Sequence, residues 1–198
     1  MTPRNGTARD LVRSPETVRC QRRRGLPGVE LRTVFDSVRR YWFYSTGFEF
    51  FVPITWRGEV RHQQRKEIVE PGSILVAYPG DVFASKRVLD AGSWHSLTVD
   101  ANALIELCGD RAAWEQVRLR PFSRMSAHLD NLVQAVVQSL QTDRLDCVRA
   151  NLRSFLVAVA GELRDVDATA TPPQPAQAPV SPLQQPTPLG PPYASQTG

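Results

Sequence analysis

The residue types that most often carry catalysis or bind metals are few in this sequence and widely spaced. The histidines are His62, His95 and His128, and the cysteines are Cys20, Cys108 and Cys147. The cysteines form no CxxC pair, and their odd number and wide separation fit neither a disulfide framework nor a zinc site. The sequence also has no GxSxG, HExxH, Walker or GxGxxG motif. We therefore expect a protein that is not an enzyme, that uses no cofactor or metal, and that keeps reduced thiols in the cytoplasm.

Aromatic side chains are dense in the first half of the chain, and a few polar groups stand among them. An aromatic wall with a few polar groups is typical of a pocket for a small molecule. Strand alternation places Phe50 and Trp56 on one face and Phe51 on the other. Plain hydrophobic core is the alternative for most of the aromatic residues, and a solvated or satisfied position is the alternative for the polar ones. The candidate ligand contacts are Phe50, Trp56, Arg61, His62, Phe83, Trp94 and His95.

These candidates lie in residues 26–100, where short β-rich runs alternate with turn signals. Two Pro-Gly pairs, Pro71-Gly72 and Pro79-Gly80, bracket one short apolar run. Proline fixes φ at the first central position of a turn, and glycine takes the positive φ that a type II turn needs at the next. Short strands separated by such turns, with no helices between them, predict a β-sandwich or a small barrel rather than a parallel α/β sheet.

The period of the apolar residues changes in residues 101–167, which are expected to be helical. Two stripes at spacings of three and four predict amphipathic helices joined by a short turn, which forms an antiparallel hairpin. The partner of these stripes is either the wall of the barrel or a second subunit, and the sequence leaves both open. The candidate dimerisation residues are Leu129, Leu132, Val136, Leu140, Leu152, Phe155 and Val159.

The ends of the chain differ from the middle in composition. The isoelectric point of 9.3 depends on residues 1–40, which hold ten arginines and four acidic residues. Residues 1–25 lack a periodic apolar pattern, so we expect a disordered Arg-rich arm that contacts phosphates weakly at most. Residues 168–198 contain nine prolines and no charged residue, which predicts a disordered tail. No run approaches the ~18 to 20 apolar residues of a membrane span, so we expect no membrane partner.

The run from Phe48 to Val88 (FEFFVPITWRGEV, a polar strand, then EPGSILVAYPGDVF) resembles the sensor domain of AraC/XylS-family transcription regulators. The resemblance covers about residues 27–165. It implies a fold that is mainly β with C-terminal helices: a cupin-like small β-barrel, or jelly roll, followed by an antiparallel helical hairpin. It also implies a small-molecule effector in the barrel and a homodimer, or a heterodimer with a full-length relative.

The sequence departs from its relatives at two places. Cupin enzymes hold metal through histidines of two motifs, whereas this chain offers only His62 in the first motif and has Phe83 at the histidine position of the second. Regulators of this family carry helix-turn-helix units after the helical segment, and the Pro-rich tail stands there instead. We therefore expect DNA contact only through a missing C-terminal module. A small cupin enzyme with a degenerate metal site is the alternative, and docking of the tail to a proline-binding groove is a third possibility.

Overall fold

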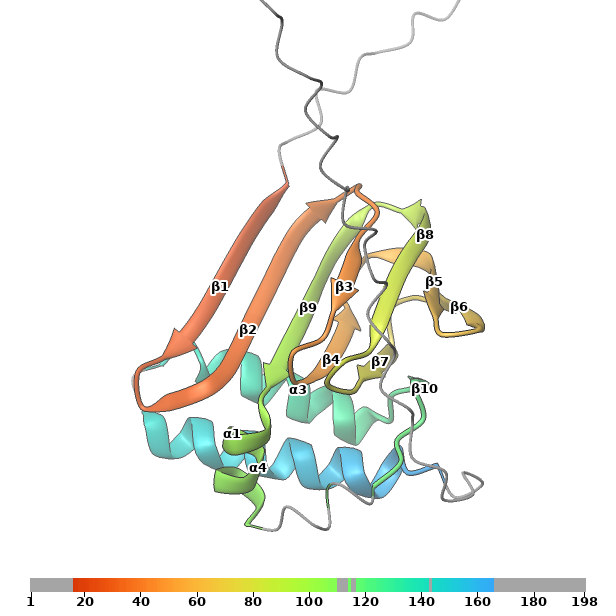
Figure 1. Ribbon diagram of the computed structural model, residues 1–198. Coiled ribbons are helices and arrows are strands. Elements are labelled where there is room, and N and C mark those ends of the chain that lie inside the picture. The colour runs from red at the N-terminus through yellow and green to blue at the C-terminus, as the bar shows by residue number, and fades with distance from the viewer. Residues whose placement is uncertain (1–15, 110–113, 115–116, 143, 166–198) are drawn as a thin grey trace, which may run out of the picture.

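The computed structural model describes residues 16–109, 114, 117–142 and 144–165. Two antiparallel sheets and a helical layer make up this part of the chain (Figure 1). The larger sheet has the strand order β1-β2-β9-β4-β7-β10, and the smaller sheet has the order β3-β8-β5-β6. The strands are β1 (Thr17–Arg23), β2 (Leu26–Ser37), β3 (Trp42–Tyr44), β4 (Phe48–Pro53), β5 (Arg57–His62), β6 (Arg65–Val69), β7 (Ser73–Ala77), β8 (Val82–Asp90), β9 (Gly92–Val99) and β10 (Phe122–Arg124). The helices are α1 (Ala101–Cys108), α3 (Ala127–Ser139) and α4 (Leu145–Glu162).

Both faces of the larger sheet are buried, each against a different layer. Side chains alternate along a strand, so Phe50 of β4 faces the helices while Phe51 faces the smaller sheet. The space between the two sheets, called the barrel interior below, holds a separate aromatic core. Its buried residues are Val34, Phe51, Trp56, Val60, Val69, Leu75, Ala77, Phe83 and Trp94.

The two Pro-Gly turns form as the sequence predicts. Gly72 has a φ of 81° and Gly80 has a φ of 90°, both in the region that glycine adopts without strain. The amide of Ser73 donates to the Glu70 carbonyl over 3.0 Å and closes the first turn. The turns bracket β7, in which every residue is buried between its neighbours in the larger sheet.

The helical stripes pack within the chain itself, on the outer face of the larger sheet (Figure 1). Leu129 of α3 and Leu152 of α4 are completely buried, and Phe155 packs edge-on against Phe50 with ring centroids 5.1 Å apart. Of the two partners that the sequence left open for these stripes, the structure places the sheet of the same chain against them. The residues named as dimerisation candidates pack there: Leu129, Val136, Leu140, Leu152, Phe155 and Val159 are buried, and Leu132 is half-buried against the same core. A role of these residues in dimerisation stays a prediction.

Two stretches form strands where the sequence analysis expected none. Thr17–Arg23 was placed in a disordered arm, but it forms β1, which pairs with β2 from Thr17 opposite Phe35 onward. As an edge strand, β1 is largely exposed, so it lacks the apolar alternation that would reveal it. Phe122–Arg124, inside the expected helical segment, forms β10 on the other edge of the larger sheet. The rest of the arm, residues 1–15, and the tail, residues 168–198, lie outside the described residues.

Among the helices that the structure describes, none is long and apolar enough to cross a membrane.

Candidate functional site

The barrel interior brings together three of the predicted ligand contacts, Trp56, Phe83 and Trp94. Each is at most 2% exposed. Phe83 stacks on Phe43 with ring centroids 4.7 Å apart, and Phe51 contacts Trp94 at 4.9 Å. Offset and edge-on arrangements of this kind stabilise an aromatic cluster beyond simple burial. The interior, called the aromatic chamber below, is therefore filled by aromatic rings that pack on one another between the two sheets.

Besides Nε2 of His62, described below, three polar atoms in and around this chamber have no hydrogen-bond partner. They are Nε1 of Trp56, Nε1 of Trp94 and Oγ of Ser85. Ser85 lies two residues from Phe83 on β8, so its side chain shares the inward face of that strand. Most buried polar side-chain atoms in proteins are hydrogen-bonded, and an orphaned buried donor costs about 1–3 kcal/mol. Several orphans in one aromatic chamber indicate a place where a ligand or water supplies acceptors.

His62 lies at the edge of the same chamber and is paired with an acid. Its Nε2 is 3.0 Å from Oδ2 of Asp81, although the approach is not in hydrogen-bonding geometry. Burial acts to raise the pKa of Asp81, but the interactions with His62 and with the Tyr78 amide outweigh it and lower that pKa. The pair ties β5 to the turn before β8. No group of three or more His, Cys, Asp or Glu residues within the described ranges could hold a metal ion.

Three other predicted contacts lie away from the chamber. Phe50 and His95 face the helices on the opposite side of the larger sheet. The prediction that Phe50 shares a face with Trp56 is wrong, because β4 ends at Pro53 and strand alternation does not continue to Trp56. His95 is 8% exposed, its Nδ1 is 2.9 Å from the Thr33 hydroxyl, and burial lowers its pKa to about 4. Arg61 is exposed, and its Nε donates to the Gln63 carbonyl over 3.0 Å. The seven predicted residues thus divide among the interior, the helix-side core and the surface.

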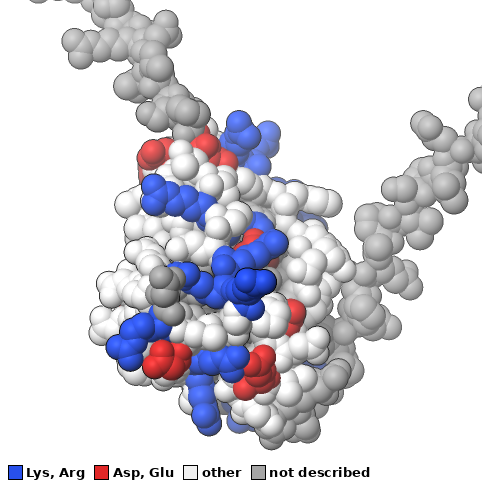
Figure 2. Space-filling model, turned by 90° about the vertical axis from the view of Figure 1, so that its left-hand side faces the viewer, with Lys and Arg blue, Asp and Glu red and all other residues white. Residues whose placement is uncertain are grey.

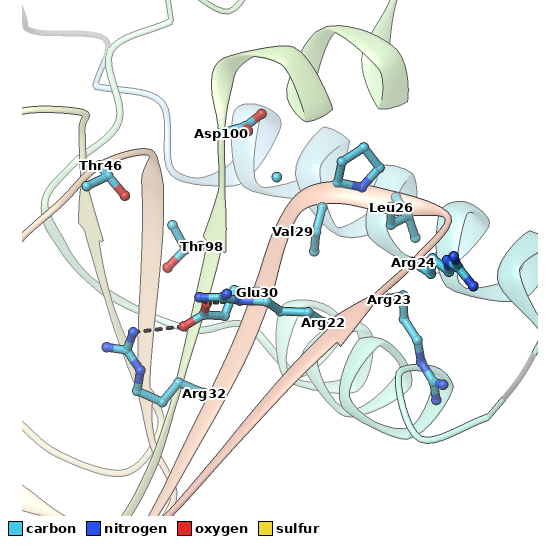
Figure 3. Close-up of a pocket in the computed structure, with 12 residues that line it drawn as sticks. Arg22, Arg23, Arg24, Leu26, Val29, Glu30, Arg32, Thr46, Thr98 and Asp100 are labelled. Carbon is cyan, nitrogen blue, oxygen red and sulfur yellow. Dashed lines mark hydrogen bonds and ion pairs between the residues drawn. The ribbon is translucent and has the colours of Figure 1, made fainter.

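The sequence analysis missed a groove where the hairpin of β1 and β2 extends past the smaller sheet (Figure 3). It encloses about 730 Å³. Arginine is the most frequent residue in its lining, and Figure 2 shows more basic than acidic side chains on this side of the molecule, among many uncharged ones. The sequence feature that could have indicated this groove is the run Arg22-Arg23-Arg24-Gly25, which precedes a strand that carries Glu30 and Arg32. The lining residues are Arg22, Arg23, Arg24, Leu26, Pro27, Gly28, Val29, Glu30, Arg32, Thr46, Thr98 and Asp100.

Comparisons by sequence find no family model and no curated protein that match this chain. Solved structures match its fold. The AraC-like transcriptional activator CuxR matches 72% of this chain with a TM-score of 0.51 at 17% identity. ToxT K231A from Vibrio cholerae matches 71% with a TM-score of 0.50 at 10% identity. A cupin superfamily protein from Desulfitobacterium hafniense matches 43% of this chain and 78% of its own length, with a TM-score of 0.39 at 8% identity.

The matched region covers 56% of CuxR and 60% of ToxT, so this chain spans little more than half the length of each. At these identities the likeness concerns the fold. Together with the two antiparallel sheets and the C-terminal helices, it confirms the predicted fold class, a cupin-like barrel with a helical hairpin.

Proposed function

We propose that this chain is the ligand-sensing domain of an AraC-like transcription regulator and that its effector binds in the barrel interior. One observation carries the proposal: Nε1 of Trp56, Nε1 of Trp94 and Oγ of Ser85 lack partners around a single aromatic chamber. The fold shared with CuxR supports the assignment to this kind of regulator.

The chemistry of the chamber favours a small polar effector without a strong charge. Two indole N–H groups can only donate, so they call for acceptor oxygens such as hydroxyl, carbonyl or ether groups. The surrounding rings of Phe51 and Phe83 make the environment of these N–H groups apolar. The nearest ionisable groups, His62 and Asp81, are partnered with each other, with Nε2 3.0 Å from Oδ2.

The experiment is a thermal-shift screen of small metabolites on the full chain, repeated on Trp94→Phe. This change removes the N–H and keeps an aromatic ring. We expect an effector that raises the Tm of the wild type and binds the variant at least tenfold more weakly. Without effector, the variant should melt somewhat below the wild type, because the smaller ring leaves a void in the core. It loses no protein hydrogen bond, since Nε1 of Trp94 has no partner in the wild type.

Trp42→Phe is the matched control, since Trp42 is 75% exposed on β3 and should affect neither binding nor melting. A screen without any stabilising molecule would contradict the proposal. So would an effector that binds wild type and Trp94→Phe equally. Stoichiometric iron, manganese or zinc in the purified protein would favour the alternative of a cupin-fold enzyme.

A further inference from the structure

The groove beside the hairpin of β1 and β2, called the arginine groove below, is separate from the barrel interior and is positively charged. Its lining carries four arginines against two acidic residues, Glu30 and Asp100, which leaves a net charge of +2. One oxygen of Asp100 is already used as the N-cap of α1, because Oδ1 accepts a hydrogen bond from the Ala103 amide over 2.7 Å. The groove is thus a concave, positively charged surface of a size that suits a small ligand.

Two of the arginines converge on one carboxylate. In the register of β1 and β2, Arg22 lies opposite Glu30, and Arg32 is two residues farther along β2 on the same face. Arg22 Nε donates to Oε2 of Glu30, and Arg32 donates to Oε1 over 2.8 Å (Figure 3). Burial acts to raise the pKa of Glu30, but the hydrogen bonds from the two arginines outweigh it and lower that pKa. The fold therefore already holds an anion between these guanidinium groups.

This arrangement leaves donors unused. Each guanidinium has five N–H donors in a planar fork, and the Glu30 carboxylate takes only some of them. The Arg22 side chain is 77% exposed and that of Arg32 is 38% exposed, so both can reach a ligand in the groove. Thr98, which is the cross-strand partner of Glu30, and Thr46 add hydroxyl groups to the lining (Figure 3). Paired arginines with hydroxyl donors are the groups that bind phosphate oxygens most strongly.

We propose that this groove binds the phosphate group of a small phosphorylated metabolite, with Arg22 and Arg32 as its principal contacts. Glu30 is a positioning residue that holds the two guanidinium groups in a common orientation. A small ligand fits better than a nucleic-acid backbone, because the site is a hollow of about 730 Å³ and its arginines are interrupted by two carboxylates. A duplex instead requires a row of phosphate contacts along an extended surface. The site does not depend on the function proposed for the barrel interior.

The test is calorimetric titration of the full chain with inorganic pyrophosphate and with ADP, at ~0.15 M salt to screen diffuse attraction. Adenosine is the uncharged counterpart of ADP. We expect both phosphate compounds to bind saturably with one site per chain and adenosine not to bind. Arg22→Ala and Arg32→Ala should each weaken pyrophosphate binding at least tenfold, which corresponds to about 1.4 kcal/mol. Arg22 is exposed, so its replacement should leave the melting temperature nearly unchanged.

Arg65→Ala is the matched control, because Arg65 is also an exposed arginine on a β-hairpin, at the start of β6. It should leave pyrophosphate binding within twofold of the wild type. Equal losses in Arg65→Ala and Arg22→Ala would overturn the proposal, since they would show attraction to overall charge. Absence of saturable pyrophosphate and ADP binding would overturn it as well, and so would a short DNA duplex that displaces both compounds with a steep salt dependence.

The same titration separates this site from the barrel interior. Trp94→Phe should leave pyrophosphate binding unchanged, whereas it should weaken an effector of the interior. If the protein binds an uncharged effector but no phosphate compound, the result supports the function proposed for the barrel interior and contradicts the phosphate site in the groove.

Discussion

His95 should make the stability of this protein fall between neutral and mildly acidic pH. Its side chain is buried between the larger sheet and α3, with Thr33 as its hydrogen-bond partner. Because burial disfavours the charged imidazolium, the pKa of His95 is lowered from 6.5 to about 4. The unfolded chain therefore takes up a proton near pH 6.5, whereas the folded chain does so only near pH 4.

The size of the effect follows from that difference. A lowered pKa of a base gives stability that is complete above pH 6.5 and is lost as the pH falls toward 4. The full difference of about 2.5 pH units corresponds to about 3 kcal/mol, of which about 2 kcal/mol is already lost at pH 5. For a domain of this size, 2 kcal/mol is a large fraction of the total stability.

The assay is urea unfolding of wild type and His95→Gln at pH 8, 7, 6 and 5. Carboxylates contribute to the pH dependence of both proteins, so the difference between the two curves isolates the histidine. We expect the wild type to lose about 2 kcal/mol more than the variant between pH 8 and pH 5. His128→Gln, at an exposed position on α3, should follow the wild type. Parallel curves for wild type and His95→Gln would refute the reasoning.

Three further changes test the packing of the fold. Leu152→Ala should lower the free energy of unfolding by about 3 kcal/mol in urea, because Leu152 is completely buried. Gly28→Ala should destabilise more than Gly80→Ala in thermal melts: both glycines have positive φ, but only a methyl group at Gly28 would overlap Asp100. Tyr78→Phe should cost about 1–2 kcal/mol by chemical unfolding, because its hydroxyl hydrogen-bonds the backbone before β10. Equal effects of the two glycine changes, or an unfolding free energy of Leu152→Ala equal to that of the wild type, would contradict these expectations.

The types of neighbouring residues were sufficient to predict the Pro-Gly turns and the change from strands to helices after residue 100. Which layer covers each face of the larger sheet depends on tertiary packing and was not predicted. Gly72 and Gly80 can adopt positive φ because glycine has no Cβ atom, and each turn is determined by a few neighbouring residues. The sequence also predicted that the side chains of Phe50 and Phe51 point to opposite sides of the sheet. It did not show which of the two side chains points into the barrel interior. That choice depends on the smaller sheet, which covers Phe51, and on the helices, which cover Phe50.

The arginine groove was not predicted for a similar reason. The concentration of arginine near the N-terminus was evident, but without apolar alternation it indicated an arm. The groove exists because β1 adds to the edge of β2 in one register, which brings Arg22 beside Glu30. Pairing of an exposed edge strand leaves little trace in its own side chains, since their polar character suits a strand and a disordered segment equally.

Strand β9 connects the regions to which the proposals refer. Trp94 points from it into the barrel interior, His95 points to the helices, and Thr98 lines the arginine groove. The groove has its own link to the helical layer: Arg23 donates to the Leu140 carbonyl at the end of α3 over 3.0 Å. From α4, Arg149 donates to the Gly25 carbonyl of the hairpin over 3.1 Å. A ligand that shifts β9 or the hairpin must therefore displace packed groups of α3 or α4, because close-packed interiors transmit small shifts. On this reasoning, ligands of either site should change amide exchange in α3 and α4 as well as in the strands that they contact.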